Sequence, residues 1–119
     1  KKTLLFNGHI DHMPAENEEH WTIPPLKPQV IENRITGLGV ADMKAGLMAS
    51  VMSLELLKDA GISLPITVKV ASACDEEGGG NGSLCAAMSG VKADAVVVCE
   101  PTNRELIAAH MGGYFSRLK

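Results

Sequence analysis

The order of strand-like and helix-like segments constrains the fold of this chain more than any other feature. Strand-like runs over 3–7, 65–73 and 94–99 alternate with a helical segment over about 43–60 and a shorter one over about 83–88. Chains with this alternation build a largely parallel sheet with helices packed on its faces. We therefore expect a layered α/β fold.

The individual segments show the periodicities that these elements require. In the second strand, Ile66, Val68 and Val70 alternate with polar residues, as in a strand with one covered face. In the longer helical segment, apolar residues recur at helical spacing, at Leu47, Val51, Leu54 and Leu57. Gly8 is expected to close the first strand, and Gly61 is a typical helix stop signal.

Two stretches are harder to interpret. Residues 12–33 are rich in Pro, Glu and Asn, and we expect a long surface loop there. Residues 106–110 are expected to form a further strand before the Gly112-Gly113 turn. No internal repeat interrupts this order, so the 119 residues are consistent with a single domain.

Composition excludes several classes of protein. The net charge is -3 with no basic stripe, so neither a nucleic acid nor an anionic membrane is an expected partner. The three cysteines form no C-x-x-C pair, which argues against a disulfide scaffold or a cysteine-rich zinc knuckle. The chain begins within a strand and without Met or a leader, so we expect a piece of a longer, cytoplasmic protein.

Histidine and carboxylate residues gather where strands or turns end. They are His9 with Asp11, then Asp42, then the pair Glu76 and Glu77, and finally Glu100. In open α/β sheets the carboxyl ends of the strands form the ligand crevice. Five acids and a histidine at one rim would repel each other unless cations lay between them. This mixture of ligands favours Zn, Mn or Co over Ca, and two ions about 3.5–4 Å apart would make a two-metal hydrolase centre.

The spacing of these residues suggests different tasks. His9 and Asp11 alternate along an extended segment, so Asp11 is placed to hold the His9 ring from behind. Neighbouring Glu76 and Glu77 diverge, so one can bind a metal while the other faces the substrate as a general base. Asp42 follows a glycine turn and is placed to bridge two ions. Each motif alone is weak, and only the joint pattern is specific.

The joint pattern resembles the M20 metallopeptidase and deacylase family, which includes acetylornithine deacetylase, succinyl-diaminopimelate desuccinylase, aminoacylase and the glutamate carboxypeptidases. The motifs that carry the resemblance are, in chain order, Gly8-His9-Ile10-Asp11, Trp21 with Pro24-Pro25, Gly37-Leu38-Gly39-Val40-Ala41-Asp42-Met43-Lys44-Ala45-Gly46, Asp75-Glu76-Glu77-Gly78-Gly79 and Glu100-Pro101-Thr102. The resemblance spans nearly the whole chain. It implies a three-layer sandwich of the zinc-dependent exopeptidase type, with a largely parallel mixed sheet.

The resemblance also implies a metal-binding role for four of these residues. His9 would bind one zinc ion, Asp42 would bridge both, Glu77 would bind the other, and Glu100 would complete the shell of the ion that His9 holds. The implied cofactor is two Zn²⁺ per full-length subunit, with Co²⁺ or Mn²⁺ as alternatives.

Two catalytic roles follow from the same resemblance. Asp11 would orient His9, and Glu76 would deprotonate the water or hydroxide that bridges the metals and later protonate the leaving amine. The family also has a non-proline cis peptide after the bridging aspartate, which corresponds here to Asp42-Met43.

Part of the family's machinery lies outside this sequence. The second zinc-binding histidine of the family follows an inserted dimerisation domain, and residues 108–113 resemble the entry to that domain. Residues 1–119 would thus be a partial catalytic, metal-binding domain that lacks the dimerisation domain. We expect this piece alone to have a deficient second metal site and little activity, and the full-length protein to be a homodimer.

Three functions are compatible with these observations. The first is a zinc-dependent amidohydrolase that removes an acetyl or succinyl group from an amino acid. The second is a dipeptidase or carboxypeptidase of the same family. The third is a non-catalytic metal-binding module, and the presence of Glu76 argues against it, because such a module has no water to activate. In the first two cases the partner is a small N-acyl amino acid or peptide.

Overall fold

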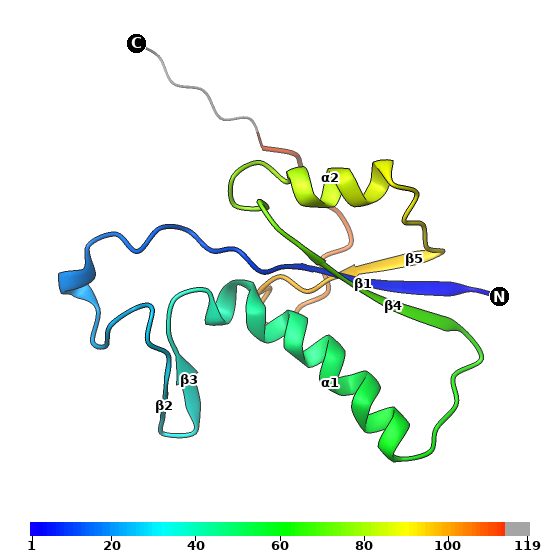
Figure 1. Cartoon of the computed structure of the whole chain (residues 1–119), viewed down its shortest axis with the longest axis horizontal. Coiled ribbons are helices and arrows are strands. Elements are labelled where there is room, and N and C mark those ends of the chain that lie inside the picture. Colours follow the sequence, from blue (N-terminus) through cyan, green and yellow to red (C-terminus); the bar gives the residue numbers. More distant parts are fainter. Residues whose placement is uncertain (114–119) are drawn as a thin grey trace, which may run out of the picture.

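A three-stranded parallel sheet organises the chain. The computed structural model describes residues 1–113. Strand β1 (Thr3–His9) lies at the centre, between β4 (Thr67–Ala73) on one side and β5 (Ala95–Val98) on the other. Both neighbours run parallel to β1, with Phe6 opposite Val70 in β4 and Val97 in β5. The carboxyl ends of all three strands therefore meet at one edge of the sheet (Figure 1).

Two helices cover the sheet. Helix α1 (Ala45–Asp59) connects β1 to β4, and helix α2 (Asn81–Met88) connects β4 to β5. From β1 the chain moves to β4 on one side of it, and from β4 it returns past β1 to β5 on the other side. Both connections are expected to be right-handed, and because they run in opposite directions, their helices lie on opposite faces of the sheet. Figure 1 shows α1 and α2 on opposite sides of the strands. The predicted layered α/β fold with a parallel sheet is confirmed.

The buried core is small and lies beneath the start of α1. Its apolar members are Leu5, Met43, Leu47 and Ala73, and the largest fully buried side chains are Met43 and His9. A Cβ added to Gly8 would lie 3.0 Å from the Met43 methyl carbon and 3.3 Å from Leu47, so α1 packs directly on the β1 backbone. This close contact places the start of α1 next to the carboxyl end of β1.

The expected end of the first strand was wrong. Strand β1 continues through Gly8 to His9, because Gly8 and His9 pair with Ser72 and Ala73 of β4. The helix stop was placed correctly, since α1 ends just before Gly61, whose φ is +68°.

Residues 12–33 contain more structure than the expected loop. A short 3₁₀ helix (Glu18–His20) is followed by an antiparallel hairpin of β2 (Gln29–Ile31) and β3 (Arg34–Thr36). Between the strands, Glu32 and Asn33 both have positive φ, which is the geometry of a tight hairpin turn. The hairpin projects from the body of the molecule beside the start of α1 (Figure 1).

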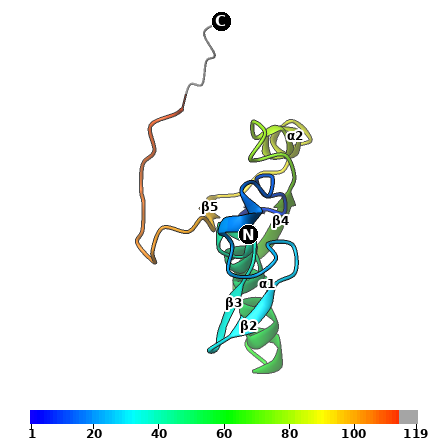
Figure 2. The same ribbon diagram turned by 90° about the vertical axis from the view of Figure 1, so that its left-hand side faces the viewer.

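The strand expected over 106–110 is absent from the described part of the chain. These residues have no regular structure, and Leu106 is almost fully exposed. In Figure 2 the segment leads away from the sheet, and a strand forms only where another strand supplies hydrogen bonds. Within residues 1–113, no helix is both long and apolar enough to cross a membrane.

Candidate metal centre

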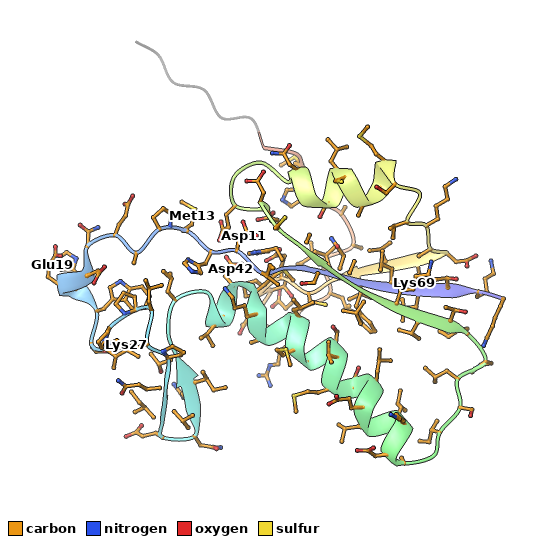
Figure 3. All side chains as sticks on the ribbon, in the orientation of Figure 1. Asp11, Met13, Glu19, Lys27, Asp42 and Lys69 are labelled. Carbon is orange, nitrogen blue, oxygen red and sulfur yellow. The ribbon has the colours of Figure 1, made fainter. Side chains whose placement is uncertain are left out.

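The candidate site lies at the carboxyl ends of the three parallel strands. His9 is the last residue of β1, Glu76 and Glu77 follow β4, and Glu100 follows β5. Asp42 joins them from the turn that leads into α1. Figure 3 shows Asp11 and Asp42 close together at this edge of the sheet. Ligand crevices in open α/β sheets form at such edges, where successive connections leave in opposite directions.

His9 is the buried centre of this group, with its side chain 1% exposed. Its Nδ1 atom lies 3.1 Å from the Asp11 carbonyl oxygen and 3.4 Å from Asp11 Oδ1. Both neighbours are acceptors, so the proton of the neutral ring belongs on Nδ1. The lone pair of Nε2 then points away from Asp11, and an imidazole oriented in this way is prepared to bind a cation.

Three carboxylates face the Nε2 atom of His9. The nearest oxygens belong to Asp42 at 3.2 Å, Glu100 at 3.7 Å and Glu76 at 3.8 Å. Burial acts to lower the pKa of His9, but hydrogen bonds to Asp11 and Asp42 and the charges of the glutamates outweigh it, so the pKa lies above 6.5. The geometry therefore requires a positive charge at Nε2, either a proton or a metal ion.

Asp11 connects His9 to the turn after β4. Its Oδ2 atom accepts a hydrogen bond of 3.1 Å from the backbone N–H of Glu77. Desolvation acts to raise the pKa of Asp11, but the N–H groups of Glu77 and Glu76 and the nearby His9 lower it overall. The other oxygen, Oδ1, is buried without a hydrogen-bond partner, and it faces the His9 ring. Asp11 is thus an ionised carboxylate that both orients His9 and tethers the Glu76–Glu77 turn.

The acids of the site repel one another. Burial, followed by the negative charge of Asp42, raises the pKa of Glu100, although His9 acts in the opposite direction. Among residues 1–113, no lysine or arginine forms an ion pair with any carboxylate of this site. A cation bound between the carboxylates would relieve this repulsion.

Asp42 is positioned by an irregular turn. The segment Val40–Lys44 is a kinked helical turn in which Asp42 and Met43 have non-helical backbone angles. The Asp42–Met43 peptide bond is cis, as the family resemblance implied. Gly46 lies in the first turn of α1, and a Cβ at this position would overlap the carbonyl oxygen of Cys99. Glycine therefore lets α1 approach the end of β5, which brings Asp42 next to Glu100.

The Glu76–Glu77 turn is held by backbone hydrogen bonds. Asp75 has a positive φ of 60°, and its carbonyl oxygen accepts a hydrogen bond from the N–H of Gly80 at 2.8 Å. The N–H groups of Gly79 and Gly80 also donate to the Glu76 carbonyl oxygen. A Cβ on Gly82 would overlap the carbonyl oxygen of Cys74, so the start of α2 packs directly on the end of β4. These contacts present both glutamates towards His9.

The donor atoms fit a metal ion of the zinc type. Two groups have ligand atoms that all lie within 4.8 Å of one another: His9, Asp42 and Glu77 in one, and His9, Glu76 and Glu100 in the other. One imidazole nitrogen with several carboxylate oxygens suits Zn, Mn or Co. The structure thus brings together all the residues that the sequence singled out. His9 belongs to both groups, so the division of ligands between two ions remains a prediction.

The other histidines take no part in these groups. His12 Nδ1 lies 2.7 Å from the Met13 carbonyl oxygen, His20 is exposed beside Glu19, and His110 is exposed in the segment after β5. Among the described residues, no cysteine belongs to a group that could hold a metal.

Sequence reasoning missed two residues beside the site. Asn7 and Ser83 line a cavity of about 140 Å³ that His9, Glu76 and Glu100 also border. Asn7 had a signal in the sequence, since it precedes His9 by two positions in a strand and shares its face. Ser83 had none, because only the tertiary structure brings α2 to this edge.

Comparison with known proteins supports this picture. A family model described as peptidase family M20/M25/M40 matches residues 5–112. Over 105 residues the chain is 34% identical to an N-formyl-4-amino-5-aminomethyl-2-methylpyrimidine deformylase of Halalkalibacterium halodurans, which covers 88% of this chain and 25% of that protein. Over 111 residues it is 32% identical to a probable succinyl-diaminopimelate desuccinylase of Staphylococcus aureus, which covers 92% of this chain and 27% of that protein.

Two solved structures share the fold. An M20 family metallo-carboxypeptidase of Sulfolobus solfataricus superposes with a TM-score of 0.72 at 29% identity, over 83% of this chain and 23% of that one. Human carnosine dipeptidase 1 superposes with a TM-score of 0.67 at 26% identity, over 82% of this chain and 22% of that one. The chain therefore spans about a quarter of the length of the proteins it matches.

Proposed function

The chain belongs to peptidase family M20/M25/M40, and on that basis we propose that its full-length polypeptide is a zinc-dependent amidohydrolase. The reaction is removal of an N-acyl group, acetyl or succinyl, from an amino acid. The observation that supports this proposal most directly is the approach of three carboxylates to Nε2 of the buried His9. The names of the similar deformylase and desuccinylase support the same reaction class.

Four residues would hold the metal. His9, Asp42 and Glu100 would bind one ion, and Asp42 and Glu77 would bind a second. When bound, such ions polarise the amide carbonyl and lower the pKa of water. Asp11 keeps the proton of His9 on Nδ1, so Nε2 stays available as a ligand.

Glu76 would be the general base and acid. Its carboxylate lies 3.8 Å from Nε2 of His9, yet the side chain is 46% exposed, so water and substrate can reach it. Glu76 would take a proton from the attacking water as the new C–O bond forms. It would then give that proton to the nitrogen as the C–N bond breaks, which releases a free amine and a carboxylic acid.

The test of this assignment is Glu76→Gln in the full-length polypeptide. We expect kcat to fall by roughly 10²- to 10⁴-fold while metal content is unchanged, because the amide keeps the shape but cannot accept the proton. The matched control is Glu55→Gln, an exposed position on α1, which should keep full activity. Normal turnover by Glu76→Gln would refute the role of Glu76.

A second candidate is a dipeptidase or carboxypeptidase. It is favoured by the two structural neighbours, which are a metallo-carboxypeptidase and a dipeptidase. A panel of N-acetyl-ornithine, N-succinyl-diaminopimelate and dipeptides would separate the two candidates. Metal binding without hydrolysis of any of these would instead indicate a non-catalytic metal-binding module.

The same proposal extends to the rest of the protein. Residues 1–119 would form part of a catalytic domain and end near the start of a dimerisation domain, and the full-length protein would be a cytoplasmic homodimer. Size-exclusion chromatography with light scattering on the full-length polypeptide tests the dimer.

A further inference from the structure

The loop between β4 and α2 carries both glutamates of the candidate metal centre. It leaves the sheet after Ala73 and enters α2 at Asn81. Glycine occupies positions 78–80, and glycine gives a backbone more conformational freedom than any other residue. A general base is effective only when it is held in the right place, so the contacts that fix this loop bear on Glu76.

The side chain of Glu76 is not fixed by packing. It is 46% exposed, and its carboxylate lies 3.8 Å from Nε2 of His9, beyond hydrogen-bond distance. The position of the carboxylate therefore depends chiefly on the backbone that carries it.

Asp75 joins the two ends of this loop. Its Oδ2 atom accepts a hydrogen bond of 2.5 Å from Nδ2 of Asn81, and its carbonyl oxygen accepts one of 2.8 Å from the N–H of Gly80. The other carboxylate oxygen, Oδ1, lies against Gly78, where an added Cβ would overlap it. The side chain and the backbone of one residue thus close the loop around Glu76 and Glu77.

The metal centre holds the same loop at a second point. The backbone N–H of Glu77 donates a hydrogen bond of 3.1 Å to Oδ2 of Asp11, which also faces the His9 ring. The loop is therefore fastened to itself by Asp75 and to β1 by Asp11. Glu76 and Glu77 lie between these two attachments, so loosening either one lets both glutamates move.

Capping of α2 is the simplest alternative role for Asp75. Within residues 1–113, however, its carboxylate is hydrogen-bonded to the side chain of Asn81 and to no backbone N–H of the first turn of α2. The bond thus closes the loop and leaves the first N–H groups of the helix without this carboxylate as an acceptor.

We propose that Asp75 and Asn81 are positioning residues for the general base, and that their side-chain hydrogen bond holds Glu76 where it can exchange a proton with the attacking water. The inference rests on the proposed amidohydrolase function and deepens it. Neither residue needs to touch the substrate or a metal ion.

The first experiment breaks the hydrogen bond in the zinc-loaded full-length polypeptide. Asn81→Ala removes the donor, and we expect kcat on the best substrate of the panel above to fall by about threefold to tenfold with little change in KM. Asn81→Asp should lower kcat further, because two carboxylates would then face each other. An aspartate in the first turn favours a helix, so this loss cannot come from a weaker α2.

The second experiment rebuilds the bond in reverse. In the double variant Asp75→Asn/Asn81→Asp, the amide at position 75 donates to the carboxylate at position 81. We expect kcat to return to within about twofold of the unaltered value, although each change alone removes a native partner. Asp75→Asn alone keeps an acceptor for Asn81 and should lose little activity.

Hydrogen exchange measures the loop without substrate or metal. In the metal-free full-length polypeptide, the amides of Gly80 and Glu77 should exchange about threefold to tenfold faster after Asn81→Ala, because both donate within the closed loop or to Asp11. The double variant should restore the slow exchange. Asp59→Asn is the control, since it removes an exposed carboxylate at the far end of α1 and should change neither kcat nor exchange.

The outcomes separate this inference from the function on which it rests. Unchanged kcat in a folded Asn81→Ala variant, or a double variant no more active than Asn81→Asp, would overturn the positioning role and leave the amidohydrolase function standing. Hydrolysis of no substrate by the unaltered polypeptide would instead refute the function. Circular dichroism verifies that each variant is folded.

Discussion

At the scale of single residues, His9 shows how one position combines several constraints. It ends the central strand and is buried, yet each ring nitrogen faces oxygen atoms. Nδ1 meets two acceptors of Asp11, so Nε2 is left with a lone pair directed at three carboxylates. Burying the Nε2 lone pair against carboxylate oxygens costs free energy, because both are hydrogen-bond acceptors, and a cation bound between them removes this cost. The residue is therefore better explained by ligand binding than by packing.

Metal affinity should depend on pH through His9. Its pKa is raised above 6.5, so a proton competes with the metal for Nε2 over a wider pH range than in a free histidine. We expect affinity for Zn²⁺ to be highest above this raised pKa and to fall steadily as pH decreases through it. Calorimetric titrations between about pH 8 and about pH 5.5 measure this dependence. Affinity that does not change with pH would contradict it.

A second residue-scale prediction concerns Gly46. An added methyl group would overlap the carbonyl oxygen of Cys99, so Gly46→Ala must push α1 away from the end of β5. We expect a loss of about 1–3 kcal/mol in the free energy of unfolding. Weaker metal binding should accompany it, because Asp42 and Glu100 separate. Thermal melts and metal titrations test both effects. Gly112→Ala is the control, since a methyl group there meets open space.

At the scale of elements, the central strand was the most predictable part. Its apolar residues indicated burial, and its alternation placed His9 and Asp11 on one face. The hairpin of β2 and β3 was not predicted, because its strands are short and fully or largely exposed and so carry little hydrophobic periodicity. The apolar run 106–110 was mistaken for a strand, because sequence cannot show whether a pairing partner exists.

At the opposite end of the sheet, a polar contact joins the starts of two strands. Asp94, just before β5, accepts hydrogen bonds of 2.7 Å from Lys2 Nζ and from the backbone N–H of Thr3, and so joins the starts of β1 and β5. Its pKa is lowered, chiefly by Lys2. A lowered pKa contributes stability above the ordinary aspartate value of 3.8, and that contribution is lost as pH falls through the lower folded value.

Urea unfolding at several pH values tests this contact. Asp94→Asn should lower stability modestly at neutral pH, because both side chains are partly exposed, and the difference from the unaltered chain should shrink in acid. Lys2→Met completes a double-mutant cycle. A stability difference that stays constant down to about pH 2 would show that the contact does not account for the lowered pKa.

At the scale of the whole molecule, the described residues leave much apolar surface uncovered. Val96, Val97 and Val98 of the edge strand β5 are each between 41% and 55% exposed. Within residues 1–113, the buried apolar core consists of only four residues, Leu5, Met43, Leu47 and Ala73. Bound metal would therefore be a major source of stability, because it binds only the folded arrangement of His9 and its carboxylates.

Metal removal tests that expectation. We expect zinc at about 100 times its dissociation constant to add about 2.7 kcal/mol to the free energy of unfolding, and a chelator to reverse the gain. The chain over 1–119 should bind fewer ions than the full-length polypeptide and show little hydrolysis of N-acetyl-ornithine or N-succinyl-diaminopimelate. Atomic absorption and thermal melts on both proteins measure this. A full-length polypeptide without metal would contradict the proposed function.

Sequence by itself determined the layered α/β fold, the order of its main strands and helices, and the residues that gather at one edge. Local periodicity carries that information, and parallel strands bring their carboxyl ends together wherever they lie in the chain. Tertiary structure alone decided which carboxylates approach each nitrogen of His9, and that Ser83 lies beside Asn7, within hydrogen-bond distance, in the lining of a cavity. Such contacts join residues far apart in the chain, and they depend on the packing of α1 and α2 against the sheet, which no local pattern encodes.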